Sequence, residues 1–240
     1  MALARKANWV GIDEVGRGPL AGPVVAAAVL IPEGVRLRGV RDSKIVPKNE
    51  REELAELIKE KCFYAYGVAS VEEIDKLNIL RASLLAMQRA FLELLEKYDW
   101  IKEDVRISFR EDKDISLISE RGVEFNMGEE KLRNVQGVLI DGKYVFSLPE
   151  DMNVACKAVV DGDAKILPIA AASIVAKTYR DEIMKELSFE HAVYGFEKNF
   201  GYATRQHLEA LENYGPCSAH RQSFMRVREV IYQKCLKFEN

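Results

Sequence analysis

The feature that most constrains the fold is the stretch GIDEVGRGPLAGPVVAAAVLI, which begins at Gly11. Two apolar runs, residues 8–13 and 23–31, are joined there by a glycine-rich turn. Both runs are apolar at nearly every position, which is typical of central strands covered on both faces. The sequence therefore predicts a sheet with layers on both sides, built around this pair of strands.

Beyond this stretch, strand patterns and helix patterns follow one another along the chain. Further strands are predicted at 63–70, 137–142 and 152–160. Helices are predicted at 47–61, 78–98, 169–187, 204–213 and 224–236. This order predicts a mixed α/β fold that ends in a C-terminal helical region.

The segment 100–133 does not fit that scheme. It is highly charged and carries three short β-like pieces, VRISF, ISLIS and GVEFN. We expect a surface hairpin insertion or a partly mobile loop. A structural embellishment is the favoured interpretation, and a contact with substrate or partner is the alternative.

Composition excludes several classes of protein. No apolar run has the length of a membrane span, and the N-terminus lacks the apolar region of a signal peptide, so a cytoplasmic protein is expected. The net charge of −3 argues against a general nucleic-acid coat protein, although a local basic face remains compatible with it. The four cysteines show no C-x-x-C pairing, which favours small buried side chains over a zinc site.

Carboxylates at strand ends are the recurring candidates for chemistry. Asp13 and Glu14 end the first predicted strand, and Asp141 ends the apolar run VLI. Asp161 and Asp163 follow the run AVV.

Ends of neighbouring strands converge, and a divalent cation such as Mg²⁺ or Mn²⁺ would relieve the repulsion among such acids. Two ions about 3.5–4 Å apart can activate water and stabilise the leaving oxygen of a phosphodiester. Ordinary turn chemistry is an equally weighted alternative at this point.

The glycine-rich turn can be read in more than one way. Successive strand side chains point to opposite faces, so Asp13 and Glu14 reach one site only if the strand breaks at Glu14. The turn GRGPLAG lacks the G-K-[ST] ending of a phosphate-binding P-loop and opens into a strand, which disfavours that motif. A backbone that approaches a sugar-phosphate, with Arg17 nearby, fits better. A plain connection between two strands is the alternative.

The same stretch resembles the opening signature of the type 2 ribonucleases H, the bacterial ribonuclease HII family. Other matching motifs follow in the family's order: Asp42-Ser43-Lys44, EEIDKLNIL, LAMQRA, LIDG, GDAK, AAASIVAKTYRDEIM, GYATRQHL and HRQSF. The resemblance covers nearly the whole chain except 100–133. It implies a ribonuclease H-like mixed five-stranded sheet flanked by helices. It also implies a catalytic core at 1–190 and a C-terminal helical substrate-binding region at 191–240.

Carried over by position, the resemblance implies a catalytic, metal-binding set of Asp13, Glu14, Asp141 and Asp163. Asp163 is preferred over Asp161 because the family's acid lies directly after a glycine and a few residues before the AAAS helix. Two Mg²⁺ or Mn²⁺ ions are expected at this site when substrate is bound.

Residues that contact the substrate are implied in the same way. Gly16, Arg17 and Gly18 match the family's recognition loop, whose backbone reads the ribose 2′-hydroxyl that distinguishes RNA from DNA. Tyr202 matches a tyrosine that stacks at the RNA–DNA junction. Other polar residues are expected either to contact substrate or to pack between helices: Ser43, Lys44, Ser173, Lys177, His220 and Arg221. Phosphate contact is favoured for Lys44 and Lys177, because a buried lysine needs an anionic partner.

The function implied is that of an endoribonuclease. It would cut RNA in RNA–DNA hybrids and nick duplex DNA on the 5′ side of an embedded ribonucleotide, in support of ribonucleotide removal. The alternatives are a catalytically inactive hybrid-binding protein and a related metal-dependent nuclease with another substrate. We expect a monomer with no membrane association. The motif QKCLKF at Gln233 weakly resembles a sliding-clamp peptide, and the end of a helix is the simpler explanation.

Overall fold

The computed structural model describes the following residues: 4–5, 8–41, 43, 45–98, 106–109, 115–118, 135, 137–148 and 154–238. They divide between two compact units. The first unit takes in Met1–Val15, Val25–Val68 and Leu84–Thr178, and the second takes in Gly16–Val24, Ala69–Ser83 and Tyr179–Asn240. The boundary predicted at residue 190 stays a prediction.

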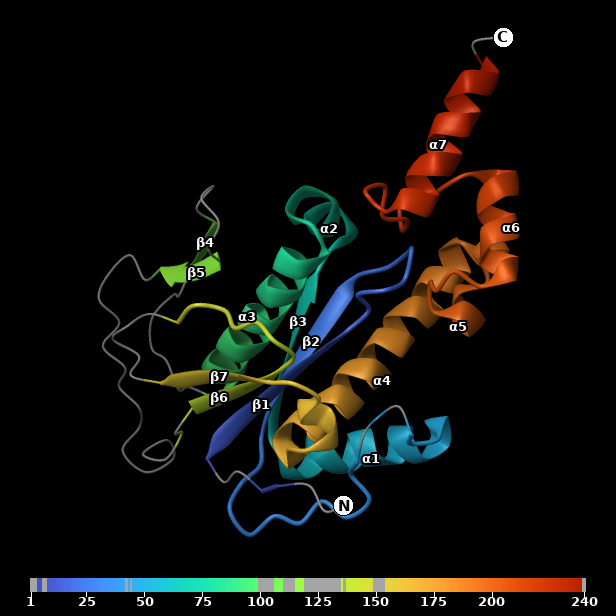
Figure 1. The fold of residues 1–240 in the computed structure, drawn as a ribbon. Coiled ribbons are helices and arrows are strands. Elements are labelled where there is room, and N and C mark those ends of the chain that lie inside the picture. The colour runs from blue at the N-terminus through green and yellow to red at the C-terminus, as the bar shows by residue number, and fades with distance from the viewer. Residues whose placement is uncertain are drawn as a thin grey trace. The chain divides into compact units, whose positions relative to one another are not determined.

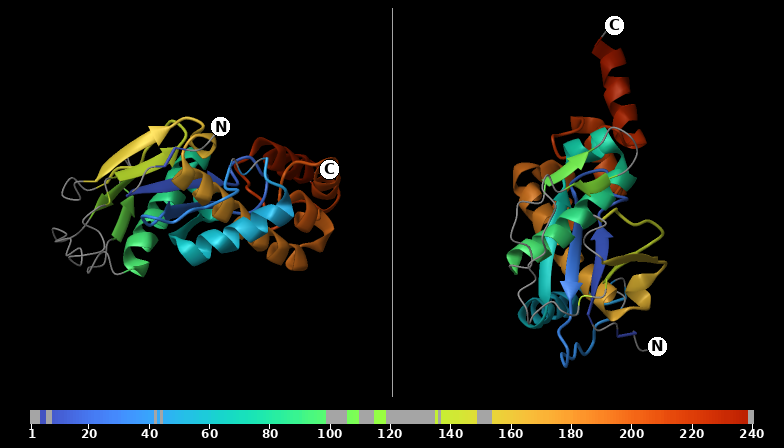
Figure 2. Two further views of the ribbon diagram at one scale, coloured as in Figure 1. Left: turned by 90° about the horizontal axis from the view of Figure 1, so that it is seen from below. Right: turned by 90° about the vertical axis from the view of Figure 1, so that its left-hand side faces the viewer.

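A five-stranded sheet with the order β3-β2-β1-β6-β7 organises the first unit (Figure 1). Its strands are β1 Trp9–Val15, β2 Val24–Leu30, β3 Phe63–Ala69, β6 Gly137–Asp141 and β7 Ala155–Val159. β1 is antiparallel to β2 and parallel to β6, and β6 is parallel to β7. Figure 2 shows the strands from two other directions. The predicted mixed five-stranded sheet is confirmed.

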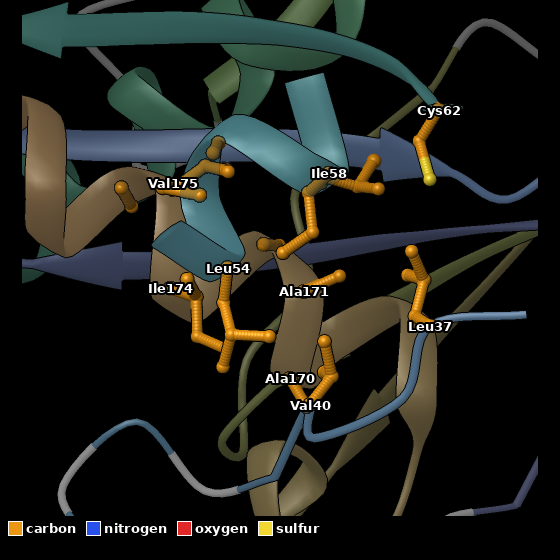
Figure 3. Close-up of a cluster of buried hydrophobic side chains, with 14 of the residues drawn as sticks. Leu37, Val40, Leu54, Ile58, Cys62, Ala170, Ala171, Ile174 and Val175 are labelled. Atoms are coloured by element: carbon orange, nitrogen blue, oxygen red, sulfur yellow. The ribbon is translucent and has the colours of Figure 1, made fainter. Parts of the chain in front are cut away.

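One face of the sheet is covered by α1 Lys48–Lys61 and by the first half of α4 Leu167–Glu190. Leu54 and Ile58 are four residues apart, so they share one side of α1, and both join a buried cluster with Ala171 and Val175 of α4 (Figure 3). Ala27 of β2 belongs to the same cluster. The helices predicted at 47–61 and 169–187 are therefore present, with ends that differ by a few residues.

The other face of β3 is covered by α3 Ile79–Lys97. The two elements touch through Gly67, where an added Cβ would lie 2.1 Å from the carbonyl oxygen of Ala86 and 2.3 Å from the amide nitrogen of Ala90. Only a glycine allows this approach of helix and strand backbones. Helices on both faces explain why every residue of β2 is buried.

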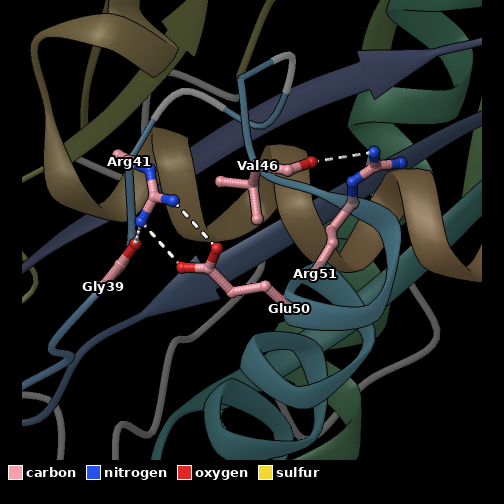
Figure 4. Close-up of polar contacts among 5 residues, drawn as sticks. All are labelled: Gly39, Arg41, Val46, Glu50 and Arg51. Carbon is pink, nitrogen blue, oxygen red and sulfur yellow. Dashed lines mark hydrogen bonds and ion pairs between the residues drawn. The ribbon is translucent and has the colours of Figure 1, made fainter.

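An ion pair ties the segment before α1 to the helix. Both Nη atoms of Arg41 donate to the Glu50 carboxylate, at 2.8 and 2.9 Å, and Arg51 donates to the carbonyl oxygen of Val46 at 3.1 Å (Figure 4). The Arg41–Glu50 pair is partly exposed, so it contributes about 1 kcal/mol or less. These contacts hold both ends of the segment that carries Ser43.

The second unit holds α2 Val71–Leu77, η3 Ala192–Tyr194, α5 Phe196–Asn199, α6 Arg205–Tyr214 and α7 Met225–Phe238. α2 was not predicted, although its start has a recognisable signal. Ser70 and Glu73 form a reciprocal capping box, the S-x-x-E pattern of a helix N-terminus. Asp75 of α2 accepts hydrogen bonds from the backbone amides of Gln222 and Ser223, at 2.9 Å each.

Two short strands, β4 Arg106–Phe109 and β5 Ile115–Ile118, form an antiparallel pair within the segment 100–133. This confirms a hairpin for that part of the predicted insertion. The third β-like piece, GVEFN at 122–126, lies outside the described residues. Of the helices that the structure describes, none combines the length and the apolar character that crossing a bilayer requires.

Candidate active site

The first candidate acids lie side by side in β1. The strand continues through Val15, so the break expected at Glu14 is wrong, yet the charge of Glu14 still acts on Asp13 without it. The antiparallel ladder with β2 accounts for this, because it pairs Glu14 with Ala26 and Val15 with Val25. Asp13 is only 6% exposed, and its Oδ1 accepts a hydrogen bond of 2.8 Å from the Glu14 amide.

Asp141 ends β6, the strand beside β1. Ile12 pairs with Ile140 in the parallel register, so the next residues along the two strands are Asp13 and Asp141. Asp141 Oδ1 accepts a hydrogen bond of 2.6 Å from the amide of Gly162. A Cβ on Gly162 would lie 2.6 Å from Ile169 Cδ1, so the absence of a side chain lets this turn close over Asp141.

The two acids that follow β7 have different surroundings. Asp163 lies in the short helix η2 Gly162–Ala164 and is 3% exposed. Asp161 adopts a left-handed backbone conformation at φ 54°, and its side chain is 73% exposed, 3.7 Å from Lys165. The left-handed backbone at Asp161 therefore accompanies an exposed Asp161 side chain and a buried Asp163 side chain. This favours Asp163 over Asp161 as a site residue.

The pKa of Asp13 is raised well above its ordinary value. Burial is the main cause, followed by the negative charges of Glu14 and Asp141, with a smaller contribution from Asp163. A hydrogen bond from Ser173 acts in the opposite direction. The four predicted acids therefore share one electrostatic environment in the first unit.

The chemistry of this donor set fits a hard divalent cation. Carboxylate oxygens are the ligands that Mg²⁺ and Mn²⁺ prefer. A bound cation would stabilise the ionised form of Asp13, which burial and the neighbouring negative charges disfavour. Among the described residues, no three His, Cys, Asp or Glu side chains are gathered tightly enough to form a ready-made ligand set.

Helix α4 brings further predicted residues to the acids. The Ser173 hydroxyl lies 2.8 Å from the Ser43 hydroxyl and hydrogen-bonds Asp13, so both serines are placed to orient this carboxylate. Lys177 follows Ser173 by four residues and so lies on the same side of the helix, half-buried. Lys44 lies outside the described residues.

The second unit contains the predicted recognition loop and the predicted tyrosine. Gly16 has φ 95°, whereas Arg17 and Gly18 are exposed. A Cβ on Gly18 would lie 3.7 Å from Cε1 of Tyr202, whose side chain is 43% exposed. Residues almost two hundred positions apart in the sequence are therefore neighbours here. Together they present an exposed backbone beside an aromatic ring.

A buried histidine pair supports the backbone of Tyr202. His207 Nδ1 donates to the Tyr202 carbonyl at 2.8 Å, and the Nε2 atoms of His207 and His220 are 3.0 Å apart. The Cys217 amide donates to His220 Nδ1 at 3.0 Å, so the His220 proton lies on Nε2 and points at His207. His220 and Arg221 are fully buried, and so the packing alternative applies to both.

This pair makes the protein sensitive to acid. Burial lowers the pKa of His207, and burial together with the His207 ring lowers the pKa of His220 to about 4. Each ring uses its unprotonated nitrogen as an acceptor, so an added proton breaks a hydrogen bond. The stability contributed by the pair is present above about pH 6.5 and is lost as pH falls toward 4.

We therefore expect the free energy of unfolding to fall by roughly 1.4 kcal/mol per pH unit within that window from His220 alone. Denaturant unfolding at pH 7, 6 and 5 measures this slope, with His220→Gln as the comparison. The slope of the variant should be smaller than that of the wild type. Equal slopes would show that the pair does not titrate as described.

Comparisons with known proteins identify the family. The ribonuclease HII family model matches residues 10–227. The chain is 43% identical over 231 residues to a ribonuclease HII of Paracoccus denitrificans, covering 96% of this chain and 91% of that protein. It is 41% identical over 227 residues to one of Neisseria meningitidis serogroup B, covering 94% and 96%.

Solved structures show the same architecture. The ribonuclease HII of Archaeoglobus fulgidus, solved in complex with PCNA, aligns with TM-score 0.63 at 24% identity, covering 92% of this chain and 95% of that chain. Bst ribonuclease HIII, solved with Mn²⁺, aligns with TM-score 0.62 at 17% identity, covering 95% and 70%. The fold is therefore the ribonuclease H-like α/β fold.

The sheet order, together with acids near the ends of the neighbouring strands β1 and β6, places this chain in the class of ribonuclease H-like nucleases. The chain belongs to the ribonuclease HII family. It is accordingly a ribonuclease H, an endonuclease hydrolase that acts on RNA in RNA–DNA hybrids, and the family is metal-dependent.

Proposed function

We propose that this enzyme also nicks duplex DNA on the 5′ side of an embedded ribonucleotide. The observation that carries the proposal is the pairing of Gly18 with Tyr202 in the second unit. The exposed residues Arg17 and Gly18 would offer their backbone amides to a 2′-hydroxyl, and the half-exposed ring offers a stacking surface for the neighbouring sugar or base. An enzyme that recognises a single ribose can act on one ribonucleotide and does not require a long stretch of RNA.

In this proposal Asp13, Glu14, Asp141 and Asp163 hold the metal. Mg²⁺ or Mn²⁺ bound as a pair would supply an activated water and stabilisation of the leaving 3′ oxygen. The protein positions the carboxylates: Ser173 donates to Asp13, and the Gly162 amide donates to Asp141. The Mn²⁺ complex of Bst ribonuclease HIII supports the choice of ion.

Lys177 and Lys44 are proposed to contact substrate phosphates, and Ser43 and Ser173 are further candidates for substrate contact. The position of Lys177 one turn after Ser173 on α4 supports its part of this proposal. A monomer in the cytoplasm stays a prediction. Residues 233–238 form the end of α7, which is the simpler explanation of their pattern. Docking on a sliding clamp stays the weaker alternative, and the PCNA complex of the Archaeoglobus fulgidus relative supports it.

An end-labelled DNA duplex with a single ribonucleotide tests the proposed function. Incubation with Mg²⁺ or Mn²⁺ should give one nick, 5′ to the ribonucleotide, with a 3′-hydroxyl and a 5′-phosphate. The same duplex without the ribonucleotide, and a reaction with EDTA, should give none. Binding with no metal-dependent nick would contradict the proposal and favour a hybrid-binding protein.

A further inference from the structure

The glycine-rich loop of the second unit, residues 16–22, is hydrogen-bonded by a fully buried arginine, Arg221. The Arg221 guanidinium donates to the carbonyl oxygens of Gly16 at 2.6 Å and of Arg17 at 3.1 Å. It also donates to the carbonyls of Pro19 at 2.8 Å and of Gly22 at 2.7 Å. One side chain, remote in sequence, therefore orders the backbone of the whole loop.

A second buried arginine, Arg180, packs against Gly16, where an added Cβ would lie 2.2 Å from its Nε, but its hydrogen bonds to the loop reach only the far end. Arg180 donates to the carbonyl oxygens of Ala21 at 3.1 Å, Pro23 at 3.0 Å and Phe200 at 3.0 Å. The hydrogen bonds of Arg180 to the loop thus lie beyond Gly18, whereas those of Arg221 include Gly16 and Arg17. This division makes the two arginines a matched pair for experiment.

The direction of the Gly16 and Arg17 carbonyls determines where the next amides point. In a trans peptide the C=O of one residue and the N–H of the next point in opposite directions, and the described residues contain no cis peptide. Because the Gly16 and Arg17 carbonyls face Arg221, the amides of Arg17 and Gly18 face away from it. Those two residues are exposed, and Gly18 lies beside Tyr202.

Charge strengthens the effect. Burial is the main reason that the pKa of Arg221 falls to about 9, and Arg180 contributes, so the guanidinium still carries its charge at neutral pH. A cation bound to a carbonyl polarises the peptide group, so the amide at its other end becomes a better donor.

We propose that Arg221 is a positioning residue for ribose recognition, which aims the amides of Arg17 and Gly18 at the 2′-hydroxyl of the substrate. The inference rests on the proposed function, because it concerns the same loop. Arg221 does not touch the substrate itself. Its loss should reduce the discrimination between ribose and deoxyribose more than the affinity for nucleic acid as such.

The test is the ratio of two dissociation constants, measured in EDTA so that no cleavage occurs. One duplex carries a single ribonucleotide, and the other has the same sequence in DNA. Arg221→Lys keeps a charge but cannot span several carbonyls, so the preference for the ribonucleotide should fall about tenfold. Arg180→Lys, the matched control, should retain most of it. A loss of folded protein lowers binding to both duplexes and leaves the ratio unchanged.

The outcomes separate the two proposals. A wild-type ratio near one overturns ribose recognition itself, and the role of Arg221 with it. A wild-type preference that Arg221→Lys leaves intact overturns the role of Arg221 alone. If Arg221→Lys does not fold, the backbone amide resonances of Arg17 and Gly18 in the wild type decide. They should shift with the ribonucleotide duplex and not with the DNA duplex, and equal shifts with both would refute the inference.

Discussion

Asp13→Asn is expected to abolish cleavage and, at the same time, to make the metal-free protein more stable. The loss of activity should be at least about 10³-fold, because the variant loses one charge from the acid set proposed to bind metal. Substrate binding should persist, since the proposed recognition loop and Tyr202 lie in the second unit.

The gain in stability follows from the pKa of Asp13. A pKa raised in the folded state means that the folded protein holds this proton more tightly than the unfolded chain does. Stability from this group is therefore fully present below the ordinary pKa of a carboxyl and is lost as pH rises through the raised pKa, so at neutral pH the residue costs stability. Asparagine has similar size and no charge, so the variant avoids that cost.

Thermal unfolding without metal should show a higher midpoint for Asp13→Asn, by roughly 2–4 °C for each kcal/mol gained. Added Mn²⁺ should raise the midpoint of the wild type much more than that of the variant. Asp161→Asn is the matched control, because its exposed side chain lies beside Lys165 at the surface. Undiminished cleavage by Asp13→Asn would refute the carboxylate site.

Gly11→Ala is expected to cause the largest loss of stability. A Cβ at this position would lie 2.2 Å from the carbonyl carbon of Pro168 and 2.4 Å from the amide nitrogen of Ile169. Both are backbone atoms at the start of α4, so they cannot yield as a flexible side chain can. β1 and α4 must separate, and the free energy of unfolding should fall by roughly 3 kcal/mol.

Local propensity alone predicts the opposite result, since alanine is favoured over glycine inside a strand by about 0.5–1 kcal/mol. The sign of the change therefore tests the close approach directly. Gly34→Ala is the comparison: its φ is 81°, and a Cβ there meets nothing within 4 Å. It should cost only about 1 kcal/mol. Urea unfolding measures both, and a Gly11→Ala protein as stable as Gly34→Ala would contradict the packing described.

The same contact links packing to the site. Gly11 precedes Asp13 by two residues on β1, and Pro168 precedes Ser173 by five on α4. Tight packing of the two elements therefore helps the Ser173 hydroxyl reach the Asp13 carboxylate. Even well below its unfolding temperature, Gly11→Ala should cleave more slowly than the wild type.

Much of the fold could be predicted because its signals are local. Continuous apolar runs indicate the buried strands β1 and β2, and the amphipathic spacing of Leu54 and Ile58 indicates α1. Helix α2 was missed because it is short and buries mainly Ile74, which leaves little periodicity to detect. Its capping box at Ser70 was the available signal.

The residues of the candidate site were predicted from motifs, but the buried residues that hold them in place were not. The choice of Asp163 over Asp161 rested on resemblance, and the left-handed backbone at Asp161 provides the physical reason for it. His220 and Arg221 were left open between phosphate contact and packing. A buried arginine that binds carbonyls has no sequence pattern of its own, because its partners lie some 200 residues away.

The sequence by itself determined the family, the strand and helix order, and the acids and glycines that form the candidate site. These follow from short-range patterns, in which each residue type constrains the backbone or the chemistry at its own position. Only the tertiary structure decided that Arg221 hydrogen-bonds the loop carbonyls, that the His207–His220 pair supports the backbone of Tyr202, and that α4 packs closely against Gly11. These depend on contacts between distant segments, whose packing and hydrogen bonds form only when the chain is folded.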